Sequence, residues 1–198
     1  MDNTKPSESS EDKTGFIKLI RRLWPNFLIY NSYAFTFSMI FINFILVSNL
    51  MWPGESFHSS EFGIMTGTGM YVMAISGIIF GFLADRYSRI YLMSFSEIIF
   101  GLSVFLNGFV PIGLGLTSFN LFLVYHLIRS FSSGGFYPII ISYVNDSTEE
   151  KEKSQFFGML QALFQFFQIS CMILSAIFFQ NAFWREFFWF SGLLFIIL

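Results

Sequence analysis

GFLADRYSR, at residues 81–89, places three charges between two long apolar runs of the sequence. The charged side chains are Asp85, Arg86 and Arg89, and each flanking run is about as long as the roughly 20 residues that a helix needs to cross a bilayer. A charge near the centre of a bilayer is costly. We therefore predict that this segment is a short loop at the water interface, closing a hairpin of two membrane helices.

The composition of the whole chain agrees with a membrane protein. Its 198 residues are 54% hydrophobic and only 12% charged, whereas about 25% of residues are charged in a soluble domain. The alternating segments of about ten residues that indicate a membrane barrel are missing from the sequence. We predict an all-α membrane protein.

Several classes of function are disfavoured by the same sequence. A net charge of -2 gives no reason to expect a nucleic-acid partner. Cys171 is the single cysteine, so neither an intrachain disulfide nor a cysteine-based metal site can form. The sequence shows no hydrolase triad, nucleotide-binding loop or metal cluster, and we predict a protein that is not an enzyme and needs no cofactor or metal.

The hydropathy pattern predicts a bundle of six transmembrane helices after a polar start. Residues 1–15 are polar and are predicted to be a disordered cytoplasmic tail. Residues 16–25 are amphipathic and form either an interfacial helix or the basic flank of the first span. The predicted spans are 26–51, 63–84, 90–111, 119–144, 155–180 and 183–198. At ~1.5 Å per residue the last span is too short for a core of ~30 Å, so we expect a longer protein of which this is the first half.

The basic residues predict the orientation of the bundle. They cluster before the first span, after the second and after the fourth: Lys13, Lys18, Arg21, Arg22, Arg86, Arg89, Lys151 and Lys153. The loops at 52–62 and 112–118 contain no lysine or arginine, and the connection between the fifth and sixth spans, with the first residues of the sixth, contains Arg185 alone. Because cytoplasmic loops are enriched in lysine and arginine, the N-terminus is predicted to be cytoplasmic.

Residues 81–89 also carry a resemblance to a known family. The segment is similar to the pattern Gly-x-Leu-Ala-Asp-Arg-x-Gly-Arg between helices 2 and 3 of the major facilitator superfamily, and departs from it at Ser88. Four other segments look like the family's: SEFG at 60–63, GGFYP at 134–138, EEKEKSQFFG at 149–158 and WR at 184–185. The resemblance implies the N-terminal six-helix half of such a transporter, with a second six-helix half as its partner.

Within this family, the DRYSR and GGFYP segments look like those of Spinster-type lipid transporters and of organic-anion symporters. The fifth span lacks the Gly-Pro-x-x-Gly-Gly run of many drug:proton antiporters, which disfavours drug efflux.

The resemblance also implies a cytoplasmic gate. Its residues would be Gly81, Asp85, Arg86, Arg89 and Asp146. In the family, the acid matching Asp85 caps a helix of the other half, where the helix dipole favours negative charge. Arg89 would pair with Asp146, and Gly81, with Gly77, would permit close helix packing. The alternative is that these charges are ordinary loop charges.

Three ionisable residues, Glu97, His126 and Arg129, lie inside predicted spans, where they should face protein or a water-filled cavity. Arg129 is close to the membrane midplane, the usual depth of transporter binding sites. Its guanidinium suits a carboxylate or phosphate. Three residues at four-residue spacing share its predicted face and are predicted substrate contacts: Tyr125, Ser133 and Tyr137. The competing interpretation is an internal salt bridge between Arg129 and Glu97.

The remaining candidates are polar residues within spans. Glu97 and His126 are candidates for proton coupling, although His126 alone is also typical of a packing residue. Gln161 and Gln165, together with Gln168, form an amide stripe that contacts either substrate or neighbouring helices. Asn43 shares a face of the first span with Thr36 and makes a weaker candidate of the same kind.

We therefore predict a secondary transporter, a symporter if proton coupling holds, that moves a small organic, anionic or amphipathic solute across a lipid bilayer by alternating access. The alternative is a membrane scaffold, a receptor or an inactive transporter fragment.

Overall fold

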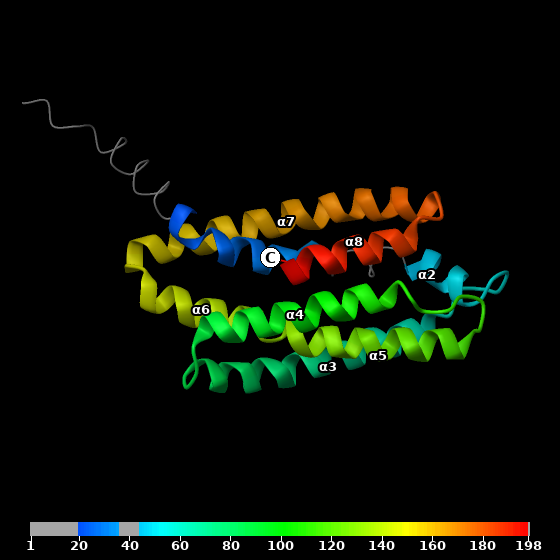
Figure 1. Ribbon diagram of the computed structural model, residues 1–198, viewed down its shortest axis with the longest axis horizontal. Helices are drawn as coiled ribbons and strands as arrows, with labels where there is room; N and C mark the ends of the chain where they lie inside the picture. Colours follow the sequence, from blue (N-terminus) through cyan, green and yellow to red (C-terminus); the bar gives the residue numbers. More distant parts are fainter. Residues whose placement is uncertain (1–19, 36–43, 198) are drawn as a thin grey trace, which may run out of the picture.

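The computed structural model describes residues 20–35 and 44–197, and all of its regular structure is helical (Figure 1). Residues 20–35 form the first helix. The helices that follow are α2 (Phe44–Met51), α3 (Ser59–Ala84), α4 (Arg89–Asn107), α5 (Leu116–Ser133), α6 (Phe136–Ser147), α7 (Glu150–Gln180) and α8 (Trp184–Ile197). The predicted all-α fold class is confirmed.

Most of the observed helices begin close to the predicted spans. The α7 helix starts at Glu150, five residues earlier than predicted, because Glu149 and Glu152 form a capping box that satisfies the first backbone N–H groups. Residues 20–25 are the opening turns of the first helix, as in the alternative in which they flank the first span. The predicted disordered tail at 1–15, the start of the amphipathic segment and the middle of the first span lie outside the described residues.

The predicted span at 119–144 is divided into α5 and α6 at Gly134 and Gly135. The backbone N–H of Gly135 bonds to the carbonyl of Ser132, a tighter turn than that of an α-helix. Pro138 has no N–H to donate, so the regular ladder is also interrupted just after this turn. The prediction of one continuous helix was wrong here, although the sequence marks the break.

The two glycines of the break allow α3 to pack closely. A Cβ at Gly134 would collide with Ser76 Oγ on α3, and a Cβ at Gly135 would lie 2.6 Å from the Phe80 ring. The predicted close approach at Gly81 is not where the helices meet most tightly, because a Cβ at Gly81 would make only an ordinary contact of 3.9 Å with Pro138. The tightest crossing lies at the glycine pair of the break, where both side chains are missing.

The α4 helix lies beside both α5 and α8 and forms the middle of one side of the bundle (Figure 1). Its crossing with α8 also depends on glycine. A Cβ at Gly101 would lie 2.8 Å from the Gly192 carbonyl oxygen, and a Cβ at Gly192 would lie 2.5 Å from the Phe105 backbone nitrogen. Small residues at such crossings let helix backbones approach closely, as is common in membrane bundles.

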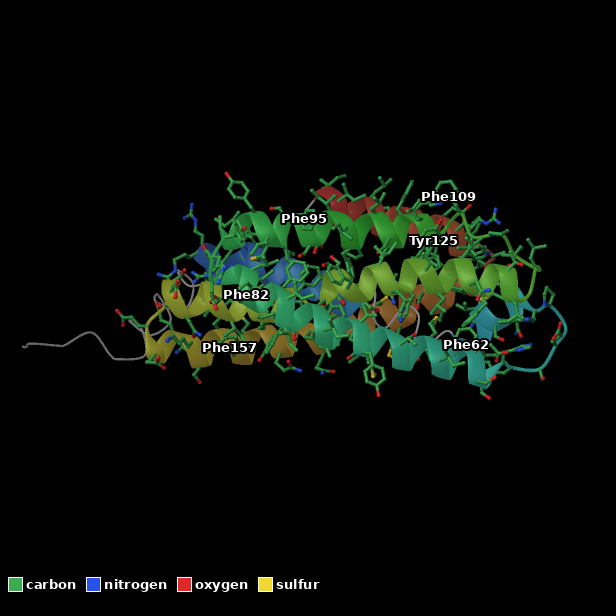
Figure 2. The ribbon with its side chains drawn as sticks, turned by 90° about the horizontal axis from the view of Figure 1, so that it is seen from below. Phe62, Phe82, Phe95, Phe109, Tyr125 and Phe157 are labelled. Carbon is green, nitrogen blue, oxygen red and sulfur yellow. The ribbon has the colours of Figure 1, made fainter. Side chains whose placement is uncertain are left out.

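The outer surface of the bundle is apolar, as expected for a protein surrounded by lipid (Figure 2). Phe82, Phe95 and Phe109 are each more than half exposed, whereas Phe62 points inward and is 2% exposed. Among the described residues, three helices are long and apolar enough to span a membrane: Ser59–Ala84, Arg89–Asn107 and Glu152–Gln180.

Candidate functional site

A cavity of about 310 Å³ lies between the first helix, α3 and α5. Its walls combine one cation and several hydroxyl groups with methionine and aromatic surface. The lining residues are Tyr33, Thr66, Gly69, Met70, Met73, His126, Arg129, Ser130 and Ser133. A second cavity of about 420 Å³ shares Tyr33, Met73 and Ser133 with it and extends toward α6 and α7.

Arg129 is the charged group of the first cavity and is 5% exposed. Its Nη2 lies 2.7 Å from Nδ1 of His126. Within the described parts of the chain, its Nη1 has no hydrogen-bond partner and no carboxylate lies within ion-pair distance of the guanidinium. The site therefore holds a buried cation whose charge is not neutralised by the described residues.

Glu97 lies elsewhere in the bundle and does not pair with Arg129. Its carboxylate is 3% exposed and accepts a 2.7 Å hydrogen bond from Ser32 Oγ of the first helix. The internal Glu97–Arg129 pair considered from the sequence is thus not formed, although Glu97 still has one oxygen without a partner among the described residues. The side of α5 that meets α4 is instead occupied by Ser132, whose hydroxyl donates to the Ser96 carbonyl.

The predicted substrate-facing residues of the fourth span are only partly brought together. Ser133 lines both cavities and Tyr137 lines the second, whereas Tyr125 packs partly buried against the core and lines neither. Four residues advance an α-helix by about 40° more than one full turn, so residues at this spacing drift around the helix. The cavity face of α5 consequently starts at His126 rather than Tyr125.

The amide stripe of the fifth span lies outside both cavities. Gln161 and Gln165 are exposed on α7, and the α7 residue that reaches the second cavity is Phe164. Its ring lies 5.4 Å from that of Tyr30 and 6.2 Å from that of Tyr33, measured between centroids. The other amide candidate, Asn43, lies outside the described residues.

Sequence reasoning missed the two tyrosines of the first helix. Tyr30 and Tyr33 both line the second cavity, and Tyr33 lines the first as well. Residues three apart share a helix face, so a pair of tyrosines at this spacing in an apolar span was a usable signal. No comparable sequence pattern marked Thr66 and Met73 of α3 as residues that line the cavity.

Residues 81–89 lie at the same end of the bundle as the start of the first helix and the turn between α6 and α7 (Figure 1). Arg89 forms an ion pair with Asp146, and Arg22 pairs with Glu152 at 2.8 Å. The Arg86 guanidinium stacks over the Phe82 ring at 4.1 Å, and Asp85 is exposed. The described parts of the basic regions that predicted the orientation thus lie at the same end.

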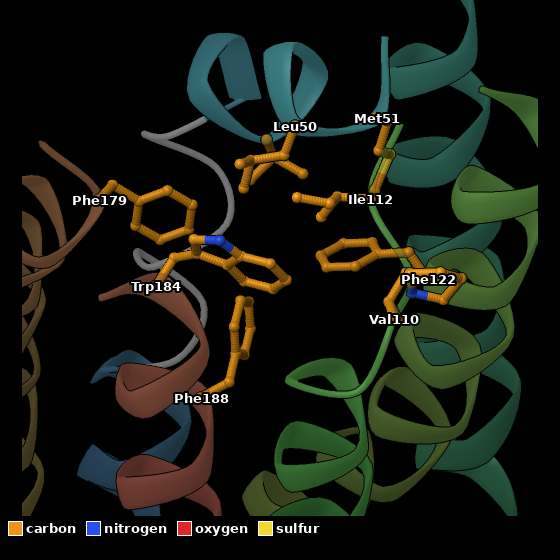
Figure 3. Close-up of a pocket in the computed structure, with 10 residues that line it drawn as sticks. Leu50, Met51, Val110, Ile112, Phe122, Phe179, Trp184 and Phe188 are labelled. Carbon is orange, nitrogen blue, oxygen red and sulfur yellow. The ribbon is translucent and has the colours of Figure 1, made fainter. Parts of the chain in front are cut away.

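An entirely apolar pocket at the opposite end is too small for a solute. Leu50 and Met51 of α2, Phe122 of α5 and Trp184 and Phe188 of α8 converge on it (Figure 3). Its volume is about 20 Å³, enough for little more than one water molecule, and no polar group lines it. It is a packing gap, so the cavities beside Arg129 are the better candidate site.

Comparison with known proteins identifies the family of this chain. Residues 27–198 match the model of the Major Facilitator Superfamily, whereas comparisons with curated proteins and with solved structures give no match. The matched region contains nearly all of the chain, including residues 81–89 and both cavities. The chain therefore belongs to the Major Facilitator Superfamily, a family of membrane transporters, and is an integral membrane protein.

Proposed function

We propose that this protein moves a small organic anion, with an apolar or aromatic body, across a membrane by alternating access, and that Arg129 binds its anionic group. The observation that carries the proposal is the buried Arg129 guanidinium, which lines a cavity and has no carboxylate partner among the described residues. Leaving a buried charge without a counter-ion costs several kcal/mol. An anionic solute would supply that counter-ion.

The shape and walls of the cavity support an amphipathic solute. A volume of about 310 Å³ lies at the lower end of the range for small-molecule sites. The Tyr33 ring and the Met70 and Met73 side chains provide apolar surface next to the cation. Together they suit a solute with one charged group and a compact apolar part, in line with the resemblance to organic-anion and lipid transporters.

Alternating access would require this six-helix unit to rock against a second one around the shared site. We propose that the end bearing Asp85 and the Arg89–Asp146 pair is cytoplasmic and forms part of the gate. Glu97 is the better candidate for proton coupling, because its carboxylate is buried and one of its oxygens has no partner among the described residues.

The test is uptake by the full protein in proteoliposomes. The probe is benzoate, with benzamide as its uncharged analogue. We expect uptake of benzoate but not of benzamide, and we expect Arg129→Gln to abolish it. Arg129→Lys should retain part of the activity, because lysine keeps the charge but loses the planar fork. Arg21→Gln is the control, since Arg21 is exposed and lies outside the cavity.

Two results would count against the proposal. Transport of benzoate by Arg129→Gln at the unaltered rate would remove Arg129 from recognition. Equal transport of benzamide and benzoate would show that charge is not recognised at all.

A further inference from the structure

The contact between Arg129 and His126 determines the state of the histidine ring. Nη2 of Arg129 and Nδ1 of His126 are 2.7 Å apart. A guanidinium has only donors, so Nδ1 must accept this hydrogen bond through its lone pair. The proton of the imidazole must then lie on Nε2, and the ring is neutral, because a charged histidine donates from both nitrogens.

The other side of the ring is held by α3. The imidazole is 3% exposed, and a Cβ added at Gly69 would overlap its Nε2 atom. The Met65 backbone, one turn earlier on α3, also interacts with the ring. Only glycine at position 69 leaves room for the imidazole, so the ring is wedged between α3 and the guanidinium.

From these contacts we infer that His126 is a positioning residue, which fixes the Arg129 guanidinium in the cavity without neutralising its charge. A carboxylate in the same place would orient the guanidinium equally well but would cancel its charge. A neutral imidazole occupies Nη2 and leaves Nη1 without a partner among the described residues. This inference rests on the proposed function, in which that remaining charge binds the anionic solute.

The inference also assigns different roles to His126 and Glu97. The nitrogen of His126 that would accept a coupling proton is already occupied by Arg129. His126 therefore serves the binding step, and proton coupling is left to Glu97.

The ring state can be measured without any solute. The chain contains two histidines, so His58→Gln leaves His126 as the only signal in protein labelled with ¹⁵N-histidine. At pH 7 we expect the ¹⁵N spectrum of a neutral ring with its proton on Nε2. A doubly protonated ring, or a ring protonated on Nδ1, would overturn the inference.

The positioning role is tested by benzoate uptake with matched variants. His126→Leu removes the acceptor, whereas His126→Asn keeps an oxygen close to the position of Nδ1. Gly69→Ala displaces the ring without altering it. Its control is Gly67→Ala on the same helix, where an added Cβ meets nothing within 4 Å.

We expect His126→Leu and Gly69→Ala to raise the half-saturating benzoate concentration about tenfold or more, with a smaller effect on the maximal rate. His126→Asn and Gly67→Ala should stay near the unaltered protein. Equal losses in His126→Leu and His126→Asn, or no loss in Gly69→Ala, would overturn the positioning role. If the unaltered protein takes up no benzoate, the proposed function is overturned. The ¹⁵N spectrum still tests the state of the His126 ring independently of uptake.

Discussion

Arg89, the first residue of α4, forms an ion pair with Asp146, near the end of α6. The pair ties the loop after α3 to the end of the divided fourth span. At the same end of the bundle, Arg22 of the first helix pairs with Glu152 of α7. Ion pairs between separate helices thus connect the segments that carry most of the chain's basic residues.

Reversing the charges of the first pair should affect transport more than stability. The side chains of Arg89 and Asp146 are 25% and 60% exposed, and a pair in this setting contributes about 0–1 kcal/mol to the free energy of unfolding. We expect Arg89→Glu to slow benzoate uptake and to change the thermal unfolding midpoint only slightly. Adding Asp146→Arg should restore part of the rate; a double variant slower than either single variant would contradict a role for the pair.

Asp85→Asn should impair the proposed gate without changing the stability of the fold. Asp85 is exposed, and its side chain contacts no charged partner in the described part of the chain, so the free energy of unfolding should change by less than about 0.5 kcal/mol. The proposed gate role places its partner on the second six-helix unit, so the rate of uptake should fall. An unaltered rate, together with an unaltered balance of inward- and outward-open states in cross-linking, would remove Asp85 from the gate.

The break between α5 and α6 should not tolerate side chains. Gly134→Ala places a methyl group against Ser76 and the Met73 carbonyl, and Gly135→Ala places one 2.6 Å from the Phe80 ring. Overpacking of this kind costs about 1–3 kcal/mol, so the unfolding midpoint in detergent should fall. The control is Gly63→Ala, whose Cβ meets nothing within 4 Å. A Gly134→Ala midpoint equal to that of the control would show that α3 can move aside.

Glu97→Gln tests proton coupling. Glutamine can still accept the hydrogen bond from Ser32, so the fold should be retained. If Glu97 carries the coupled proton, benzoate uptake by the variant should no longer be accelerated by an imposed pH gradient. Glu186→Gln changes an exposed glutamate at the start of α8 and serves as the control. Persistence of the acceleration in Glu97→Gln would assign coupling to another group.

Much of the fold could be predicted because the signals are local. Apolar runs predicted most helices to within a few residues, and the charges of residues 81–89 marked the turn between α3 and α4. The sequence marks the break at Gly134 and Gly135 by these two glycines and by Pro138. The averaged hydropathy does not show it, because glycine and proline hardly alter the mean of an apolar segment. Residues 81–89 and four other segments supplied the resemblance to the family.

The candidate site was less predictable, because periodicity is a weak guide inside a membrane. In a soluble helix the polar face points to water, but here the lipid-facing and protein-facing sides are both apolar. The sequence could therefore predict a depth for Arg129 without showing which way α5 is rotated. Residues at four-residue spacing rotate slightly around the helix. The neighbour of Arg129 in the cavity is therefore His126 and not the predicted Tyr125.

The sequence by itself determined that the chain is an apolar helical bundle, roughly where most of its helices lie, and which loops carry the positive charge, because hydropathy and charge act residue by residue. Only the tertiary structure decided that Arg129 contacts His126 rather than Glu97, and that Arg89 meets Asp146 while Asp85 stays exposed. Those pairings depend on how each helix is turned about its own axis. Glycine contacts such as Gly69 with His126 and Gly77 with Gly134 fix that rotation, and they join residues far apart in the chain.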